Sequence, residues 1–407
     1  MKSIAALKLI IFNMADRTPL VEALLNNNFE QAKALLDSGE RIPKDLRDSD
    51  LETIYSRIFR GKAFDVIDSL IENGGIEADV YEYDSFDKSV FRTIVNLPAD
   101  EEILDYLGRF ITKFENINDE VQDQTILSYA LDQKADVKII KCLIDAGCSV
   151  NYLNKNDETL IFQVASKNML DPKISAGYLE LLINEGVDIN KGNIVRETPL
   201  LLAVQKRKLE LVDLLLSQGA NPNEQGKDDY TAFFWAAALM FDLKLYEQLS
   251  AYASPDFDLV SKEGQHILTE FLRIASRESD IPLLVKILEQ GADLKQTSKY
   301  YEKGKSGLDW LAEKSAAIFE AGFNAGGIEV NEQDNEGNTI LHKVCAFNVN
   351  YDQNLAKETY RKVKFLLENG ADISITNTKD QTALMLASDD NIKTKTVQLL
   401  LSTSIKS

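Results

Sequence analysis

The sequence has little of the chemistry from which active sites and covalent frameworks are usually built. It contains three cysteines and two histidines among 407 residues. An odd number of cysteines without paired spacing argues against a disulfide framework or a zinc site and indicates a reducing, cytoplasmic compartment. Two histidines make a Ser-His-Asp or Cys-His arrangement hard to assemble, and phosphate-loop, H-E-x-x-H and G-x-S-x-G motifs are absent. We therefore expect no catalytic residues, no metal and no cofactor, and we predict that the protein is not an enzyme.

Positive charge is also scarce. Lysine and arginine number 45 against 65 aspartate and glutamate residues, which gives a formal net charge of −20. A polyanion of this strength is repelled by phosphate backbones and anionic lipids, so binding to nucleic acid or to a membrane is disfavoured. The charge would attract a basic protein partner, although an acidic surface also simply favours solubility.

Long apolar runs and flexible linkers are missing as well. The run from Ile4 to Phe12 is short, is broken by Lys8 and lacks a small-residue cleavage site. We interpret residues 1–15 as a capping segment, with a poor signal peptide as the alternative. At 44% hydrophobic residues the chain can bury a large core. A globular chain of this length would form two or three domains, but no Pro/Ser/Gly-rich linker separates them, which favours one continuous array.

What the sequence does contain is a repeated pattern. Its first half begins with threonine and is clearest as TPLVEA at Thr18, TPLLLA at Thr198 and TALMLA at Thr382. Its second half ends a leucine-rich run with glycine, as in LLLSQGANPN and LLENGADI. The spacing from Thr198 to Thr231 is 33 residues, and more divergent units stay in register. These units are expected to open at Thr53, Ser89, His266 and Ser306.

This pattern resembles the T-P-L-H-x-A signature and the 33-residue period of ankyrin repeats. The resemblance is strong over residues 124–405 and looser over residues 51–121. It implies an all-α ankyrin-repeat solenoid of about eleven helix-turn-helix repeats with finger loops, capped at both ends. Residues 16–405 would form this single continuous array, in which each unit leaves apolar faces open and must stack on its neighbours.

The residue types at fixed positions suit such units. Threonine caps the first helix, and Pro19 and Pro199 follow where no amide hydrogen is needed. Glycines such as Gly219 stand where the second helix must end in a left-handed residue. We expect His266 to cap its helix in place of threonine and His342 to hydrogen-bond within its turn. Insertions are expected between the two helices near residues 169–177 and 348–358, and another lengthens the finger loop 295–305.

Candidate binding residues follow from the way ankyrin repeats usually bind, through finger tips and the concave face of the first helices. The residue four positions after the threonine points toward that face, and both tryptophans fall in this column. Exposed tryptophan is a common interface anchor; packing on the next repeat is the alternative for the tryptophans, and a solvated loop is the alternative for the basic, aromatic tip of finger 295–305. The candidate partner-binding residues are Tyr230, Phe234, Trp235, Phe241, Tyr300, Tyr301, Lys303 and Trp310.

The expected function is a non-catalytic scaffold or adaptor that binds a protein partner through its concave face and finger loops and acts as a monomer. One alternative is an acidic inhibitor or immunity protein that blocks a basic enzyme. A secreted effector adaptor is a variant of the first hypothesis. An enzyme hidden in the divergent repeats would need a polar pocket within residues 51–121.

Overall fold

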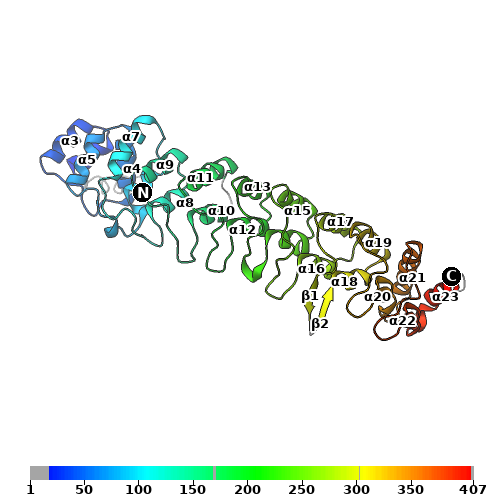
Figure 1. Ribbon diagram of the computed structural model, residues 1–407. Coiled ribbons are helices and arrows are strands. Elements are labelled where there is room, and N and C mark those ends of the chain that lie inside the picture. The colour runs from blue at the N-terminus through cyan, green and yellow to red at the C-terminus, as the bar shows by residue number, and fades with distance from the viewer. Residues whose placement is uncertain (1–17, 168–170, 302, 405–407) are drawn as a thin grey trace, which may run out of the picture. The chain divides into compact units, whose positions relative to one another are not determined.

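The computed structural model describes residues 18–167, 171–301 and 303–404. The chain divides into two compact units, residues 1–194 and residues 195–407. Each unit is built from successive helix-turn-helix pairs (Figure 1). The described residues form eleven such pairs, as expected for an ankyrin-repeat array. The predicted capping segment 1–15 and the centre of the predicted insertion near residues 169–177 lie outside the described residues.

The first unit consists of five pairs and two short 3₁₀ turns. Its first helices are α2 (Pro19–Leu25), α4 (Asp48–Arg60), α6 (Val90–Ile94), α8 (Ile126–Asp132) and α10 (Leu160–Ser166). Its second helices are α3 (Phe29–Asp37), α5 (Phe64–Glu72), α7 (Glu101–Ile111), α9 (Val137–Asp145) and α11 (Pro172–Asn184). The 3₁₀ turns η1 (Val80–Glu82) and η2 (Phe86–Lys88) lie in the loop before α6.

The second unit consists of six pairs and one β-hairpin. Its first helices are α12 (Pro199–Gln205), α14 (Ala232–Phe234) continued by η4 (Trp235–Leu239), α16 (Ile267–Ile274), α18 (Gly307–Ala312), α20 (Ile340–Ala346) and α22 (Ala383–Ser388). Its second helices are α13 (Leu209–Ser217), α15 (Leu243–Ser250), α17 (Ile281–Glu289), α19 (Ala316–Ala325), α21 (Gln353–Glu368) and α23 (Thr394–Ser404). The strands are β1 (Thr297–Tyr300) and β2 (Lys303–Ser306), and the 3₁₀ turns are η3 (Lys227–Asp229), η5 (Glu278–Asp280) and η6 (Asn391–Lys393).

The predicted helix starts are confirmed at the clear repeats. The hydroxyl of Thr198 accepts a hydrogen bond from the Leu201 amide at 3.2 Å, and Pro199 occupies the first turn of α12. This bond satisfies an amide that has no partner within the helix. The same cap is formed by Thr18, Thr125, Thr159, Thr231, Thr339 and Thr382, and by the serines of two divergent units, Ser89 and Ser306.

One expected helix start, at Thr53, and one expected helix cap, at His266, are wrong. Thr53 opens no unit, because α4 already begins at Asp48 and the Thr53 hydroxyl donates to the carbonyl of Ser49 inside the helix. His266 precedes α16, but its side chain makes no capping bond. Its Nδ1 instead lies 3.1 Å from the Ser298 hydroxyl on strand β1. Both deviations come from contacts outside the repeat signature.

The predicted ends of the second helices are also confirmed. Gly147 has φ 109° and Gly219 has φ 92°, values that only glycine adopts without strain. Five further glycines of the same column share the left-handed conformation: Gly39, Gly74, Gly186, Gly291 and Gly370. The expected turn of His342 is present too, since its Nδ1 lies 2.8 Å from the Thr339 hydroxyl.

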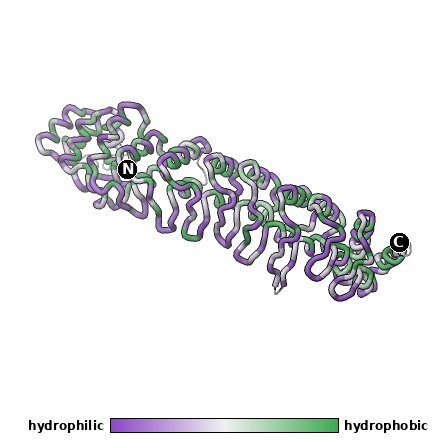
Figure 2. Tube along the Cα trace, viewed as in Figure 1, coloured by the Kyte–Doolittle hydropathy of each residue, from purple (hydrophilic) through white to green (hydrophobic). Residues whose placement is uncertain are grey.

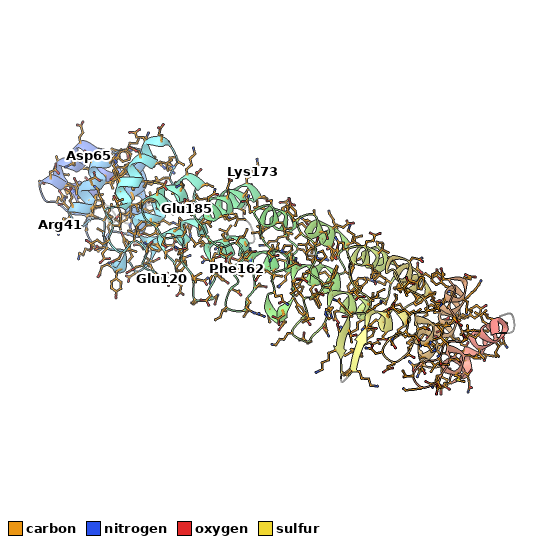
Figure 3. All side chains as sticks on the ribbon, viewed as in Figure 1. Arg41, Asp65, Glu120, Phe162, Lys173 and Glu185 are labelled. Atoms are coloured by element: carbon orange, nitrogen blue, oxygen red, sulfur yellow. The ribbon has the colours of Figure 1, made fainter. Side chains whose placement is uncertain are left out.

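The core of each unit lies between successive pairs. Leucine and alanine of the first helices are buried, as Leu200 and Ala203 illustrate, and hydrophobic residues follow the helices while the loops are mainly hydrophilic (Figure 2). Phe162 of α10 is buried in the same way, whereas Asp65 and Lys173 on second helices point outward (Figure 3). The small alanine side chain allows neighbouring helices to approach closely.

Aromatic rings fill the core of the divergent repeats of residues 51–121. Phe59 contacts Phe110 edge-on with ring centroids 5.6 Å apart, and Phe110 contacts Phe114 at 5.1 Å. Phe91 extends this chain of rings to the next first helix through Phe114. Such ring pairs stabilise beyond the area they bury, so these repeats hold together without the regular leucine and alanine.

Polar bonds join neighbouring pairs where the turn between two helices leaves backbone carbonyls unpaired. In the first unit the Tyr178 hydroxyl on α11 donates to the Ala135 carbonyl. In the second unit the Gln248 amide on α15 donates to the Leu209 carbonyl at 3.1 Å. Two lysines act alike: Lys362 donates to the Ala312 carbonyl at 2.6 Å, and Lys393 donates to the Cys345 carbonyl at 2.8 Å.

Tyr178 and Tyr246 provide a matched test of these bonds, because both are fully buried on second helices. The Tyr246 hydroxyl has no hydrogen-bond partner among the described residues. We expect Tyr178→Phe to lower the free energy of unfolding by about 1–2 kcal/mol, since it leaves the Ala135 carbonyl unsatisfied. Tyr246→Phe should be neutral or stabilise by up to about 1 kcal/mol. Urea denaturation measures both; an equal loss in the two variants would contradict the assignment.

Lys362 predicts a pH dependence of stability. Burial lowers its pKa to about 8, whereas an unfolded lysine titrates near 10.4. Between these values the unfolded state binds more protons, so stability rises with pH across this window. Relative to Lys362→Met, the wild type should gain about 2 kcal/mol of unfolding free energy between about pH 8 and pH 10. A flat or falling difference would show that the lysine stays charged when buried.

Candidate functional site

The candidate residues lie on three consecutive pairs of the second unit, at the first helices and the finger loops beside them. One group surrounds α14 and η4, and the other belongs to the β1–β2 hairpin and α18. The hairpin projects past the end of α18, and the first helix of the intervening pair is α16 (Figure 1). Contacts of α16 with both η4 and α18 make these three first helices neighbours in space.

The first helix that carries Trp235 is wider than an α-helix. After Phe234 it continues as a π-helical turn, in which the Met240 amide donates to the Trp235 carbonyl at 2.9 Å. The three alanines at positions 236–238 are buried, so the widened turn still packs closely against its neighbours. Turns of this kind are rare and occur often at functional sites. The spacing of the repeat gives no sign of it.

The aromatic residues around Trp235 divide between surface and core. Tyr230 stacks on Phe234 with centroids 4.5 Å apart and meets Trp235 edge-on at 6.0 Å. Phe234 is only 2% exposed, so its ring serves packing and is not available to a partner. Trp235 stays half-buried. Phe241 lies away from this cluster and stacks on Phe271 of α16 at 4.9 Å.

The finger 295–305 folds into a two-stranded antiparallel hairpin, closed by the pairing of Tyr300 with Lys303. Tyr301 at its tip has φ 52° and is 80% exposed, and Lys303 is exposed beside it. The Tyr300 ring lies edge-on to Tyr301 at 4.7 Å. The hairpin therefore presents two tyrosines and a lysine on a short rigid support.

Trp310 is a packing residue. It is 8% exposed, and the Tyr300 ring meets it edge-on at 4.9 Å. The Lys305 ammonium covers its other side, 3.3 Å from the ring centroid, and is paired with Glu313 at 2.7 Å. This cation–π contact fixes the hairpin to α18. Trp235 and Trp310 share a sequence column, but their environments differ because the extended finger before α18 covers Trp310.

Arg273 on α16 connects the two aromatic groups. Its guanidinium binds Glu270 through two hydrogen bonds of 2.7 and 2.6 Å. Donation of these hydrogen bonds to Glu270 raises the pKa of Arg273, and the nearby phenol groups of Tyr300 and Tyr230 act in the same direction. Both tyrosines are therefore within electrostatic range of one guanidinium. Because α16 contacts both η4 and α18, Arg273 lies on the helix between the two predicted groups. We call these residues together the aromatic face: Tyr230, Trp235, Arg273, Tyr300 and Tyr301.

Lys343 on α20 holds the neighbouring finger. Its ammonium lies 2.6 Å from carboxylate oxygens of both Asp309 and Asp334. Burial lowers the pKa of Lys343, but the two carboxylates outweigh it and the pKa is raised. Burial likewise raises the pKa of Asp309, and hydrogen bonds from Lys343 and Ser306 outweigh it, so that pKa is lowered. The three groups therefore stay charged near neutral pH.

The Ser298–His266 contact brings together the residue types of a nucleophile and a base, but its surroundings are structural. Ser298 is 4% exposed, and its hydroxyl accepts the His266 backbone amide at 3.0 Å while also pairing with Thr269. Burial lowers the pKa of His266. This network attaches strand β1 to α16. Among the described residues no cluster of His, Cys, Asp and Glu has the geometry of a metal site, and no helix is long and apolar enough to cross a membrane.

A groove that the sequence did not reveal lies beside the hairpin. It encloses about 940 Å³ between β2 and residues 326–338 of the next finger. Tyr300, Tyr301 and Lys303 line one side, and acidic residues line the other. The signal that could have located it is Lys295, which stands four residues after Gly291, where four other fingers carry asparagine: Asn151, Asn190, Asn223 and Asn331.

Comparison with known proteins adds a family to this architecture. A family model described as ankyrin repeats (3 copies) matches residues 173–258. The chain is an ankyrin-repeat protein. Ankyrin repeats are in general protein-binding modules without catalytic chemistry of their own, so binding to protein is the activity that this family implies.

Relatives of this ankyrin-repeat chain are distant. Protein lin-12 of Caenorhabditis elegans is 28% identical over 185 residues, which is 41% of this chain and 12% of lin-12. Putative ankyrin repeat protein R664 of Acanthamoeba polyphaga mimivirus is 29% identical over 94 residues, which is 22% of this chain and 56% of the relative. The chain thus spans less than two thirds of either relative. The crystal structure of the Bcl-3 ankyrin repeat domain aligns with a TM-score of 0.47 at 22% identity, covering 60% of this chain and 100% of that domain.

The two tryptophans, the only ones in the sequence, allow their environments to be measured separately. Trp310→Phe leaves Trp235 as the single reporter, and Trp235→Phe leaves Trp310. We expect acrylamide to quench Trp235 more strongly than Trp310, since only Trp310 is covered by a lysine and a tyrosine. Trp310→Ala should lower the unfolding free energy by about 3–5 kcal/mol as a core truncation. Equal quenching of both would contradict the burial of Trp310.

Proposed function

We propose that this chain is a non-catalytic adaptor or scaffold that holds a protein partner against the aromatic face of its second unit. The observation that carries the proposal is a set of exposed and half-buried aromatic side chains at α14–η4 and on the β1–β2 hairpin, with Arg273 on α16, the first helix between them. Tyrosine, tryptophan and arginine are the side chains that most often dominate interface energetics. Phe234 and Trp310 support this surface from beneath.

The conformation of the hairpin tip supports the same function. Tyr301 adopts a left-handed backbone and exposes 80% of its surface. Tyrosine adds large contact area at low conformational entropy cost, so a rigid tip that presents it is well suited to recognition.

The charge of the chain supports a basic partner. A net charge of −20 steers a basic protein toward the surface. The cysteines are free thiols, which suits a reducing, cytoplasmic compartment. We take the protein to act as a monomer, with residues 16–405 as one array of repeats.

The matched pair Tyr301 and Tyr351 tests the proposal. Both tyrosines are strongly exposed, at 80% and 90%, and both have left-handed backbones, but Tyr351 lies in the loop before α21. We expect Tyr301→Ala to weaken binding of a partner captured from lysate by about 2 kcal/mol, a typical anchor value, and Tyr351→Ala to leave it unchanged. Isothermal titration with the purified partner gives both affinities.

Trp235→Ala in the same assay should weaken binding similarly, with a thermal melt to separate binding from unfolding. Equal affinities of the Tyr301 and Tyr351 variants, together with a footprint on the second helices, would overturn the proposal. If the captured partner is an enzyme, its activity in the complex distinguishes recruitment from inhibition.

A further inference from the structure

The groove beside the hairpin exists because one tie between neighbouring fingers is missing. The Asn331 side chain, four residues after Gly327, donates to the Gly370 carbonyl at 3.0 Å and accepts from the Asp372 amide at 2.8 Å. Asn223, four residues after Gly219, binds the Ser254 carbonyl and the Asp256 amide in the same way. Each asparagine thus clamps one finger to the backbone of the next.

At the hairpin this position is Lys295, which cannot accept a hydrogen bond with its side chain. Its ammonium reaches Glu332 of the next finger at 2.8 Å through an exposed ion pair. Exposed pairs of this kind contribute little to stability. No side chain at this position therefore hydrogen-bonds to the backbone of the next finger. The groove of about 940 Å³ lies between these two fingers.

Strand β2 turns an unpaired edge toward this groove. The sheet contains only β1 and β2 among the described residues, and β1 lies on the side of the preceding finger, where Gln296 donates to the Phe257 carbonyl at 3.3 Å. The Gly307 amide donates to the Gln296 carbonyl at 3.2 Å, which sets the alternation of bonded and non-bonded pairs. The bonded residues of β2 are then Lys303 and Lys305.

Gly304 and Ser306 consequently direct their amide and carbonyl groups away from β1. The Ser306 amide is used by the Asp309 carboxylate at 2.8 Å. The Gly304 amide and carbonyl remain available at an exposed position that carries no side chain. An unpaired edge of this kind is a template for an added strand.

The opposite wall of the groove determines which strand fits. Four carboxylates line it: Glu329, Glu332, Asp334 and Glu336. Two of them are engaged by Lys295 and Lys343. Glu329 and Glu336 form no ion pair with any residue that the structure describes, and Glu336 is held only by the Asn338 amide at 3.3 Å. The groove therefore has negative charge left for cationic side chains.

We propose that this groove binds an extended segment of a partner protein that carries lysine or arginine, and that the segment adds to the edge of β2 as a third strand. The inference rests on the proposed function and names the chemistry of the partner. Backbone bonds to Gly304 set the register, alternate cationic side chains meet Glu329 and Glu336, and Tyr301 covers the end of the segment. A strand beside the four residues of β2 spans about 13 Å.

The test uses end-blocked fluorescent heptapeptides and the full chain. The sequence KVKVKVK is expected to bind, and EVEVEVE is not. KVKVKVK with N-methyl groups on alternate backbone nitrogens keeps its charge but cannot pair as a strand, so its affinity should fall at least tenfold. This arm leaves the protein untouched, and fluorescence anisotropy measures all three affinities.

Protein variants then locate the site. Gly304→Pro removes the free amide; it is combined with Thr297→Ala, because the Thr297 methyl lies 2.7 Å from the new Cβ. The matched control is Thr297→Ala with Lys299→Pro, which alters the outer edge of β1 instead. We expect a loss of at least tenfold for the first and no change for the second.

The charge arm compares Glu329→Gln/Glu336→Gln with Glu210→Gln/Glu247→Gln, which changes the net charge equally on exposed second-helix positions. Only the groove pair should weaken KVKVKVK, by about fivefold or more. The inference is overturned if the affinity for KVKVKVK is unchanged by N-methylation and by Gly304→Pro. It is also overturned if both charge pairs change that affinity equally. If Tyr301 and Trp235 variants weaken partner binding and the groove variants do not, the strand addition is wrong. The proposed function is unaffected by that result.

Discussion

Every helix pair in this protein has open apolar faces and a turn whose carbonyls its own helices cannot satisfy. Stacking meets both requirements at once. Leucine and alanine of one first helix pack against the next, and a side chain from the following second helix donates to the exposed turn. Tyr178, Gln248 and Lys362 are chemically unlike one another, yet each donates to a carbonyl of the preceding pair. Successive pairs are thus joined by donors of different chemistry.

Because packing and hydrogen bonds between pairs occupy many side chains, they limit which residues remain available at the surface. The inward side chains of the second helices pack in the core or bind the turns. Neighbouring fingers are joined by hydrogen bonds from asparagines such as Asn223 and Asn331. Residues on the first helices near the finger bases are less constrained. Tyr230, Trp235 and Arg273 occupy such positions, so their chemistry can follow a partner without disturbing the stack.

Much of the fold follows from local rules that act within one repeat. Threonine caps, prolines in the first turn and left-handed glycines are decided by neighbours three or four residues away, which is why they were predictable at Thr198, Pro199 and Gly219. His266 departs from prediction because its partner, Ser298, is 32 residues distant. The π-helical turn after Phe234 depends on packing of three alanines against other helices, which no single repeat encodes.

At the candidate surface, too, some features depend on local sequence and others on contacts between distant residues. Position in the column gave Trp235 and Trp310 the same expected role. Their exposure differs because an elongated finger follows α16 and brings Tyr300 and Lys305 over Trp310. Only knowledge of how that finger folds could have separated the two residues. Sequence patterns therefore predicted the candidate residues, while the distinction between exposed and buried members required the structure.

The hairpin changes one finger of the repeat array at a small cost in folding free energy. Extra residues in a surface loop add little closure entropy, and the stack beneath is unaffected because the insertion begins after the second helix has ended at Gly291. The replacement of asparagine by Lys295 then releases this finger from the next one. An unpaired strand edge is normally a liability. Here it is four residues long, and carboxylates line the groove that it faces. These carboxylates repel a second copy of this acidic chain and attract a strand that carries positive charge.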